Sequence, residues 1–175
     1  MFEVRIHGRG GQGVVTSAEL LSVAAFDGGA HAQAFPSFGS ERTGAPVVAF
    51  CRIDDKRIRT REPISHPDAL IVGDPTLLGL SEVRSGIEPG ALLIVNSVRA
   101  VDGFLAVPAT ELAREHLGRP LPSAALLGAF AAASGVVTLD ALCLAIRERF
   151  SGATAEGNIA AATAAHAHVM EAVPC

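Results

Sequence analysis

The sequence contains neither tryptophan nor tyrosine, and only 8 of its residues are phenylalanine. Proteins that hold single-stranded nucleic acids usually stack the bases on aromatic rings, so this class is disfavoured. A basic excess is also missing, because 14 Lys and Arg face 18 Asp and Glu for a net charge of −4. Nucleic-acid binders usually carry clustered positive charge. We therefore expect no nucleic-acid partner.

The sequence has no long uninterrupted hydrophobic run. The longest apolar stretch, Ala124–Val137, is broken by two glycines and a serine, whereas a transmembrane helix needs about 20 apolar residues. The N-terminus begins with Glu3 and Arg5 in place of a basic cluster and an apolar run, so we expect no signal peptide. These absences predict a cytoplasmic protein without membrane contact.

Cysteine is scarce. Cys51, Cys143 and Cys175 are far apart, odd in number and outside any CxxC pair. A disulfide framework or a thiolate cluster within this chain is therefore excluded. His166 and His168 are two positions apart on a predicted helix and point in different directions, so we expect no metal site there either.

The 175 residues suffice for one domain with its own core. With 49% hydrophobic and 18% charged residues, the chain is not of the disordered class. No internal repeat or flexible linker interrupts it. We therefore expect a single domain over residues 1–175.

The hydrophobic pattern predicts alternating strands and helices, which is typical of an α/β fold. The opening reads as a strand, a glycine-rich loop, a helix and a second strand, a βαβ unit with a parallel sheet: Phe2–His7, then Val14–Phe26, then His31–Phe35. Further strands are predicted at Pro46–Ile53, Ala69–Val72, Ala91–Val95 and Phe104–Val107. An antiparallel hairpin is expected between Pro46–Ile53 and Arg57–Thr60. The C-terminal part is predicted to form Ala-rich helices at Thr110–Leu117, Ala124–Ser134, Leu139–Phe150 and Glu156–Ala172.

The loop after the first strand reads Gly8-Arg9-Gly10-Gly11-Gln12-Gly13. Glycines at this spacing, between a strand and a helix, allow a tight turn and a close approach to an anion such as a pyrophosphate. A dinucleotide site also expects an acidic residue about 20 positions on, and His31–Phe35 contains none. Three interpretations remain: a dinucleotide site, tight helix–strand packing without a ligand, or a loop that meets a phosphate-bearing ligand or a partner chain.

A second unusual loop, residues 37–46, places Glu41 and Arg42 between two glycines before Pro46. Functional residues often lie on such loops beside a rigid scaffold, and the alternative is a solvated connection.

Other candidate functional residues also have structural interpretations that involve no ligand. His7 either acts on a ligand or is a hydrogen-bonded histidine at a strand end. Arg57, Arg59 and Arg61 either bind a phosphate or an acidic partner or protect an edge strand by their charge. Gly73-Asp74-Pro75 with Asn96 fails as a thiamine diphosphate motif at its third position. The residues by themselves indicate no catalytic set.

Taken together, the motifs resemble the gamma subunit, or gamma domain, of the 2-oxoacid:acceptor (pyruvate/ketoacid:ferredoxin) oxidoreductase family. The resemblance spans nearly the whole chain and rests on the following segments: Gly8–Gly13, Phe35–Gly39, Glu41-Arg42, Gly44–Val47 leading to Arg52-Ile53, Leu127-Gly128-Ala129, and Asn158. Related chains often carry Asn where this one has Pro122-Ser123, and Gly or a longer residue in place of Thr43.

The resemblance implies a Rossmann-like domain with a mostly parallel sheet, an inserted β-hairpin and C-terminal Ala-rich helices. It also implies a multisubunit enzyme that converts a 2-oxoacid and coenzyme A to an acyl-CoA and CO2. Thiamine diphosphate with Mg, [4Fe-4S] clusters and in some assemblies FAD would lie in alpha, beta and delta-type partner subunits. Electrons would pass to ferredoxin or to an NAD-reducing flavin subunit. Members act on pyruvate, 2-oxoglutarate, branched-chain or aryl-substituted substrates, and the sequence does not select among them.

From the resemblance we expect this chain to supply no catalytic residue and no metal ligand, and to help form the coenzyme A region. The residues expected there are Gly10, Gly11, Gln12, Gly13, Glu41, Arg42 and Thr43. Two alternatives of other classes are a stand-alone nucleotide-binding module or small dehydrogenase, and a scaffold that touches no ligand.

Overall fold

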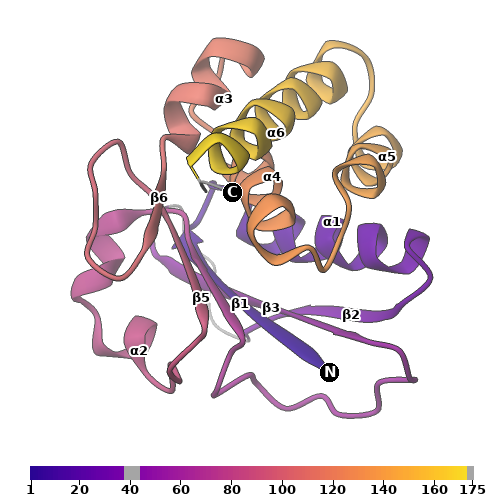
Figure 1. Cartoon of the computed structure of the whole chain (residues 1–175), viewed down its shortest axis with the longest axis vertical. Helices are drawn as coiled ribbons and strands as arrows, with labels where there is room; N and C mark the ends of the chain where they lie inside the picture. The colour runs from indigo at the N-terminus through magenta and orange to yellow at the C-terminus, as the bar shows by residue number, and fades with distance from the viewer. Residues whose placement is uncertain (38–43, 173–175) are drawn as a thin grey trace.

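The computed structural model describes residues 1–37 and 44–172. A six-stranded sheet in the order β2-β3-β1-β4-β5-β6 lies beneath a layer of helices (Figure 1). The strands are β1 (Phe2–Arg9), β2 (His31–Pro36), β3 (Pro46–Asp54), β4 (Ala69–Val72), β5 (Leu92–Asn96) and β6 (Leu105–Val107). The helices are α1 (Val14–Asp27), a 3-10 helix η1 (Pro75–Gly79), α2 (Ser81–Arg84), α3 (Ala109–Leu117), α4 (Ser123–Ser134), α5 (Leu139–Arg149) and α6 (Gly152–Ala172). The predicted α/β class with a mostly parallel sheet is confirmed.

The central position of β1 follows from its partners on both sides. It pairs in parallel with β4 and antiparallel with β3. Its residues Val4–Gly8 are all buried, including Arg5 and His7. The apolar run of β4 is likewise buried along its whole length, as expected of a strand covered on both faces. The carboxyl end of β1, where the glycine loop begins, therefore lies at the middle of the sheet.

The expected hairpin between Pro46–Ile53 and Arg57–Thr60 is wrong. Residues 57–60 form no strand, because β3 already has a partner on each edge, β1 on one side and β2 on the other. The antiparallel pair in the sheet is β2 with β3, which are consecutive in the chain. The fold thus contains a hairpin, but it is made of a different pair of segments.

The opening β1-α1-β2 unit is present with both strands in one sheet, but the two strands are not neighbours. The chain passes from β1 through α1 to β2, but β3 lies between the two strands in the sheet. Because β3 is antiparallel to both, β2 still runs in the same direction as β1. The sequence pattern identified the elements and their direction but did not predict the insertion of β3.

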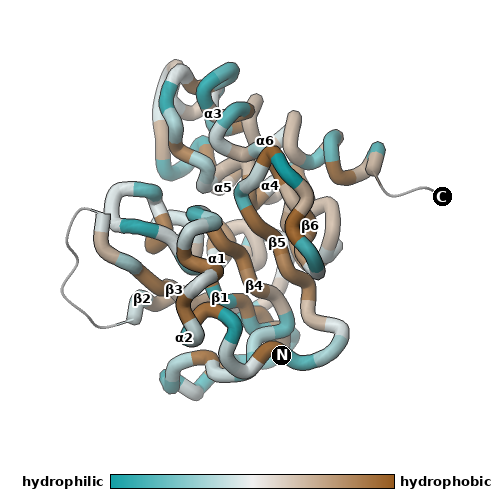
Figure 2. Tube along the Cα trace, turned by 90° about the vertical axis from the view of Figure 1, so that its left-hand side faces the viewer, coloured by the Kyte–Doolittle hydropathy of each residue, from teal (hydrophilic) through white to brown (hydrophobic). Residues whose placement is uncertain are grey.

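The main core lies between the sheet and the helices α1, α4, α5 and α6. Figure 2 shows the hydrophobic colour gathered along the central strands. The largest fully buried side chain of the main core is Phe130 of α4, and Leu21 of α1 and Ile146 of α5 are also fully buried. A smaller cluster covers the opposite face under η1 and α2: Leu70, Val72, Leu77, Val83 and Val95. Two covered faces fit a sheet whose central strands are continuously apolar.

Small residues let α4 and α6 pack closely. A Cβ built on Gly128 of α4 would lie 2.0 Å from the carbonyl oxygen of Ala162 in α6. Only glycine fits that position, so the predicted Ala-rich helices meet almost backbone to backbone.

Within the described ranges, 1–37 and 44–172, no helix combines the length and hydrophobicity needed to cross a bilayer.

Candidate functional site

The glycine loop turns from β1 into α1 with two residues in the left-handed region. Gly11 has φ 92° and Gly13, which caps α1, has φ 76°. Residues with a Cβ rarely adopt these angles, so glycine is required at both positions. A Cβ on Gly8 would also come within 2.5 Å of Val14 Cγ2. The motif therefore serves tight strand–helix packing and at the same time keeps Gly11 open to solvent.

Within residues 1–37 and 44–172, the backbone N–H groups in the first turn of α1 have no hydrogen-bond acceptor. The first intrahelical bond runs from the N–H of Ser17 to the carbonyl oxygen of Gly13, at 2.8 Å. Gly13 supplies no side-chain cap, and the first turn contains no acidic residue. A cleft of about 320 Å³ lies over this turn, lined by the loop glycines, Val14–Thr16 and Val47. Free N–H groups and the helix dipole favour an anion at such a position.

Gln12 shapes the loop from within. Its Oε1 accepts a hydrogen bond from the Arg9 N–H at 2.7 Å, and its own N–H donates to the Arg9 carbonyl oxygen at 3.0 Å. These two bonds close the turn, and the first directs the side-chain carbonyl of Gln12 toward the loop backbone. Of the sequence-predicted site residues, Gly10, Gly11, Gln12 and Gly13 are therefore brought together in one turn.

The second predicted loop is joined to the glycine loop at its C-terminal end. The Gly10 N–H donates to the Ala45 carbonyl oxygen at 2.9 Å, and the Gly44 N–H donates to the Gly10 carbonyl oxygen at 3.2 Å. Glu41, Arg42 and Thr43 lie outside the described residues. Their chain neighbour Gly44 nevertheless lies directly against the glycine loop.

Arg9 is a site residue that sequence reasoning missed. Its guanidinium donates through Nε to Asp74 Oδ2 at 2.8 Å, through Nη1 to the Gly44 carbonyl oxygen at 3.1 Å, and through Nη2 to Thr76 Oγ1 at 2.8 Å. It also lines the cleft over α1. The signal available in the sequence was a cation inside an otherwise glycine-rich motif. Arg9 thus connects three segments at one end of the sheet.

Asp74 and Asn96, the residues of the failed thiamine motif, have structural roles. Asp74 accepts from Arg9 and from Thr76, and it caps η1. Asn96 donates to the Gly73 carbonyl oxygen at 3.0 Å and to Thr110 Oγ1 at 2.7 Å. Both side chains are engaged in these bonds, and the residues therefore do not fit a site for thiamine diphosphate or its metal ion.

His7 is a buried strand residue at 5% exposure. Desolvation by burial, followed by the charge of Arg5, lowers the pKa of His7 to about 4. Within residues 1–37 and 44–172, its Nε2 has no hydrogen-bond partner. The imidazole is therefore neutral at physiological pH, and it faces the sheet side that carries Arg5, away from the helix layer.

Arg57, Arg59 and Arg61 are exposed in an irregular segment that connects β3 to β4. Two buried arginines hold the segment through hydrogen bonds. Arg52 donates to the Glu62 carbonyl oxygen at 2.6 Å, and Arg5 donates to the Ser65 carbonyl oxygen at 3.3 Å. The segment leads into the amino end of β4, whereas the glycine loop follows the carboxyl end of the parallel strand β1. These basic residues therefore lie at the opposite end of the sheet from the glycine loop.

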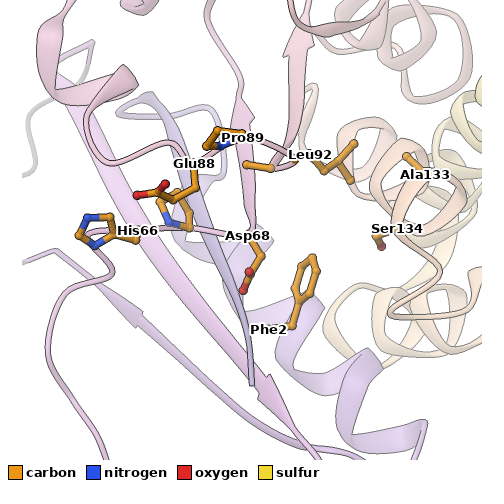
Figure 3. A pocket seen from close by; sticks show the side chains of 11 residues that line it. Phe2, His66, Asp68, Glu88, Pro89, Leu92, Ala133 and Ser134 are labelled. Carbon is orange, nitrogen blue, oxygen red and sulfur yellow. The ribbon is translucent and has the colours of Figure 1, made fainter.

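A separate cleft of about 330 Å³ lies at the amino ends of the parallel strands (Figure 3). Phe2, Asp68 and Leu92 line it. The Asp68 carboxylate already accepts the Glu3 N–H at 2.8 Å. Ligands of open α/β sheets bind at the carboxyl ends of the strands, so the glycine-loop end is the better candidate site.

Among the described residues no group of three or more His, Cys, Asp or Glu side chains is placed to hold a metal ion. Cys51 is buried in β3, and burial raises the pKa of its thiol to about 12. Cys143 is partly buried in α5.

Comparison with known proteins gives matches over almost the whole chain. The sequence model of the pyruvate ferredoxin/flavodoxin oxidoreductase family matches residues 3–168. The common gamma subunit of pyruvate/ketoisovalerate oxidoreductases from Thermococcus kodakarensis is 49% identical over 173 residues, covering 93% of this chain and 94% of that protein. Subunit PorC of pyruvate synthase from Methanothermobacter thermautotrophicus is 43% identical, with 97% and 96% covered.

Solved structures share the fold. The pyruvate oxidoreductase subunit PORC of Thermotoga maritima superposes with a TM-score of 0.84 at 33% identity, covering 95% of each chain. The 2-oxoglutarate:ferredoxin oxidoreductase of Magnetococcus marinus gives a TM-score of 0.78 at 17% identity, covering 99% of this chain but 31% of that one. The fold of this chain therefore matches one part of that larger chain.

Proposed function

The chain belongs to the pyruvate ferredoxin/flavodoxin oxidoreductase family as a gamma subunit of a multisubunit oxidoreductase, and from this premise we propose what its glycine loop does. The complex would oxidatively decarboxylate a 2-oxoacid with coenzyme A, giving an acyl-CoA and CO2. This chain would form part of the coenzyme A site with Gly10, Gly11 and Gly13. Alpha, beta and delta-type subunits would complete the enzyme in the cytoplasm, with ferredoxin or an NAD-reducing flavin subunit as electron acceptor.

The observation that carries the proposal is the uncapped start of α1 beneath a cleft, at the carboxyl end of the central strand. Coenzyme A carries a pyrophosphate and a 3′-phosphate, and free backbone N–H groups at a helix start are suited to such anions. A second-strand carboxylate that would bind the ribose of a dinucleotide is missing from His31–Pro36. Coenzyme A therefore suits the loop better than NAD.

The 37–45 loop would complete the anion site. Gly44 and Ala45 are bonded to Gly10, so we propose that Arg42 contacts a phosphate group or pairs with Glu41, with Thr43 beside them. Gln12 would keep the loop in shape through its bonds to Arg9.

The chemical steps are assigned to partner subunits. Thiamine diphosphate with Mg and [4Fe-4S] clusters there would supply decarboxylation and electron transfer, and FAD where NAD is the acceptor. In the overall reaction the 2-oxoacid loses CO2 and two electrons, and the coenzyme A sulfur forms a thioester with the acyl carbon as the thiol proton leaves. This chain would bind and orient coenzyme A for that step.

The test uses the complex assembled by co-expression of its chains, with Arg42→Ala in this one. Loss of a charge-assisted phosphate contact is expected to cost about 1.5–3 kcal/mol, or roughly tenfold to hundredfold in the Kd for coenzyme A. The matched control is Arg114→Ala, because Arg114 is exposed on α3 with only a 3.9 Å contact to Glu111. An intact complex with unchanged coenzyme A affinity in Arg42→Ala would favour a pure scaffold.

A further inference from the structure

The sheet ends in a long strand on one side and in a short strand on the other. β2, with 6 residues, is the outermost strand beside β3, and it lies beneath α1 (Figure 1). Within residues 1–37 and 44–172, no strand pairs with its outer edge. β6, at the opposite edge, has only 3 residues. A short edge strand resists pairing with another chain, whereas a longer one offers a template for it.

The bonding pattern of β2 shows which of its backbone groups point outward. The N–H of Ser37, just after the strand, donates to the Val48 carbonyl oxygen at 2.8 Å. Bonded and non-bonded pairs alternate in an antiparallel ladder, so the odd-numbered residues of β2 bond to β3. Ala32 and Ala34 therefore direct their N–H and C=O groups to the outer edge. Within the described part of the chain, these groups have no backbone partner.

β2 lacks the features that usually protect an edge strand. Natural edges carry lysine or other charged side chains, internal prolines or bulges. β2 reads HAQAFP, without Asp, Glu, Lys or Arg, and its proline is the last residue. Phe26, in the last turn of the helix that packs on β2, adds an apolar side chain that is 68% exposed. An uncharged strand can lie beside an identical strand without placing like charges opposite each other.

We propose that two copies of this chain pair along β2, antiparallel about a two-fold axis at Gln33, so that their two sheets become one. Across the axis, Ala32 of each copy exchanges both backbone hydrogen bonds with Ala34 of the other. Pro36, which has no N–H, then lies outside the new ladder. The interface is isologous, because each copy contributes the same strand. This inference does not depend on the coenzyme A proposal.

The side chains of β2 suit this register. Gln33 of one copy lies opposite Gln33 of the other, where the amide N–H of one can donate to the amide oxygen of its mate. In the single chain, Gln33 Oε1 is buried and has no hydrogen-bond partner among the described residues. Rotation about the terminal torsion of the side chain can turn this oxygen toward the axis. Phe35 of each copy lies opposite the exposed His31 of the other.

Sedimentation equilibrium of the purified full-length chain tests the pairing. The wild type should form a reversible dimer with a micromolar Kd. Gln33→Glu places two carboxylates opposite each other across the axis and should raise the Kd about tenfold. Within one copy the new carboxylate is opposite Arg52, whose Nη1 has no partner among the described residues, so the fold should be kept, as far-UV circular dichroism would verify.

The matched control is Ala167→Glu, which adds the same charge to an exposed position of α6. This helix contacts β6, the strand at the opposite edge of the sheet. The Kd of Ala167→Glu should therefore equal that of the wild type.

Disulfide cross-linking reads the register and keeps the inference testable if Gln33→Glu does not fold. Gln33→Cys is introduced together with Cys143→Ser and Cys175→Ser, since the remaining Cys51 is buried. Opposite residues of a non-bonded pair have Cα atoms about 4.5 Å apart, within the range of a disulfide. Mild oxidation should give a band at twice the chain mass of 18.0 kDa. In Ala34→Cys the two cysteines are two positions out of line, beyond the limit of about 7 Å, and should not cross-link.

Three results would overturn the inference. The first is a wild-type chain that stays monomeric up to about 0.5 mM and does not cross-link through Gln33→Cys. If the amides of Ala32 and Ala34 then exchange slowly only in the co-expressed complex, the edge belongs to another subunit. The second is a dimer that Gln33→Glu leaves unchanged, which would pair through another face. The third is cross-linking of Ala34→Cys in place of Gln33→Cys, which would show a different register.

Discussion

Arg9 in the glycine loop and Asp74 after β4 form an ion pair with Nε and Oδ2 2.8 Å apart. The pair joins the carboxyl ends of two adjacent parallel strands, β1 and β4. Burial by itself would raise the pKa of Asp74, but hydrogen bonds from Thr76 and Arg9 outweigh it, so the pKa lies below its ordinary value. The loop that we propose binds coenzyme A is therefore held in place by its neighbour in the sheet.

Arg9→Gln should misplace the glycine loop more than it destabilises the fold. The pair is partly exposed, so its loss should cost no more than about 1 kcal/mol of unfolding free energy. The KM for coenzyme A of the complex should rise severalfold while kcat stays near the wild-type value, because chemistry occurs on other chains. Steady-state kinetics with coenzyme A varied checks this. A fall in kcat at unchanged KM would contradict a positioning role.

The Arg9–Asp74 pair also predicts an acid-dependent loss of stability. Because the folded pKa of Asp74 is below the ordinary carboxyl value of 3.8, its contribution to stability is present above that value and is lost as pH falls through the folded pKa. In Asp74→Asn, the unfolding free energy should vary less between pH 4 and pH 2 than it does in the wild type. Urea titrations across this range measure the effect, with exposed Asp140→Asn of α5 as control.

His7 should make the fold less stable in mild acid. With a folded pKa of about 4 against 6.5 in the unfolded chain, the unfolded state binds more protons between these values. Stability should therefore fall as pH decreases from 6.5 to 4, by up to about 3 kcal/mol, and His7 should add nothing below that range. Urea titrations on His7→Leu should lack this slope. His168→Gln, on the exposed surface of α6, should retain it.

Gly128→Ala should strongly destabilise the protein. Alanine in a helix interior normally stabilises relative to glycine by about 1 kcal/mol, but here the new Cβ would overlap the Ala162 carbonyl, 2.0 Å away. Overpacking of this kind costs about 1–3 kcal/mol or more. Chemical denaturation of Gly128→Ala beside Gly79→Ala separates the two effects, because Gly79 has open space around its Cα. Equal midpoints for the two variants would show that α4 and α6 can move apart.

Arg5→Met should release the irregular segment between β3 and β4. The Arg5 guanidinium donates to the carbonyl oxygens of Ser65 at 3.3 Å and of Ser85 at 2.6 Å, among others. Without it those carbonyls lose their donors, and limited trypsin digestion should cut at Arg57, Arg59 or Arg61 at least about tenfold faster. Arg114→Met is the control. Unchanged cleavage would mean that Arg52 alone holds the segment.

Local patterns predicted most elements of the fold because their signals are local. The alternation in β1, the apolar run of β4 and the cap of α5, where Thr138 Oγ1 accepts the Ala141 N–H at 3.1 Å, all follow from nearby residues. The insertion of β3 between β1 and β2 does not, because strand order depends on which edges are free after the chain collapses.

The same limit applies to the candidate site. The tight turn of the glycine loop was predicted from the spacing of its glycines, because the positive φ angles at Gly11 and Gly13 are a local requirement. The part played by Arg9 was missed because its partners, Asp74 and Gly44, are distant in sequence. Burial of Arg5 and His7 was also missed, because alternation marks such residues as solvent-facing unless a later segment covers them.

The most direct test of the central claim is purification of this chain, tagged, from its native cells, with assay of the eluate for coenzyme A-dependent dye reduction. A panel of 2-oxoacids would be supplied one at a time. The predicted result is co-elution with thiamine- and cluster-bearing chains in fixed proportion, and dye reduction that requires both coenzyme A and one 2-oxoacid of the panel. A stable, lone, inactive chain, recovered under conditions that keep complexes intact, would contradict the assignment.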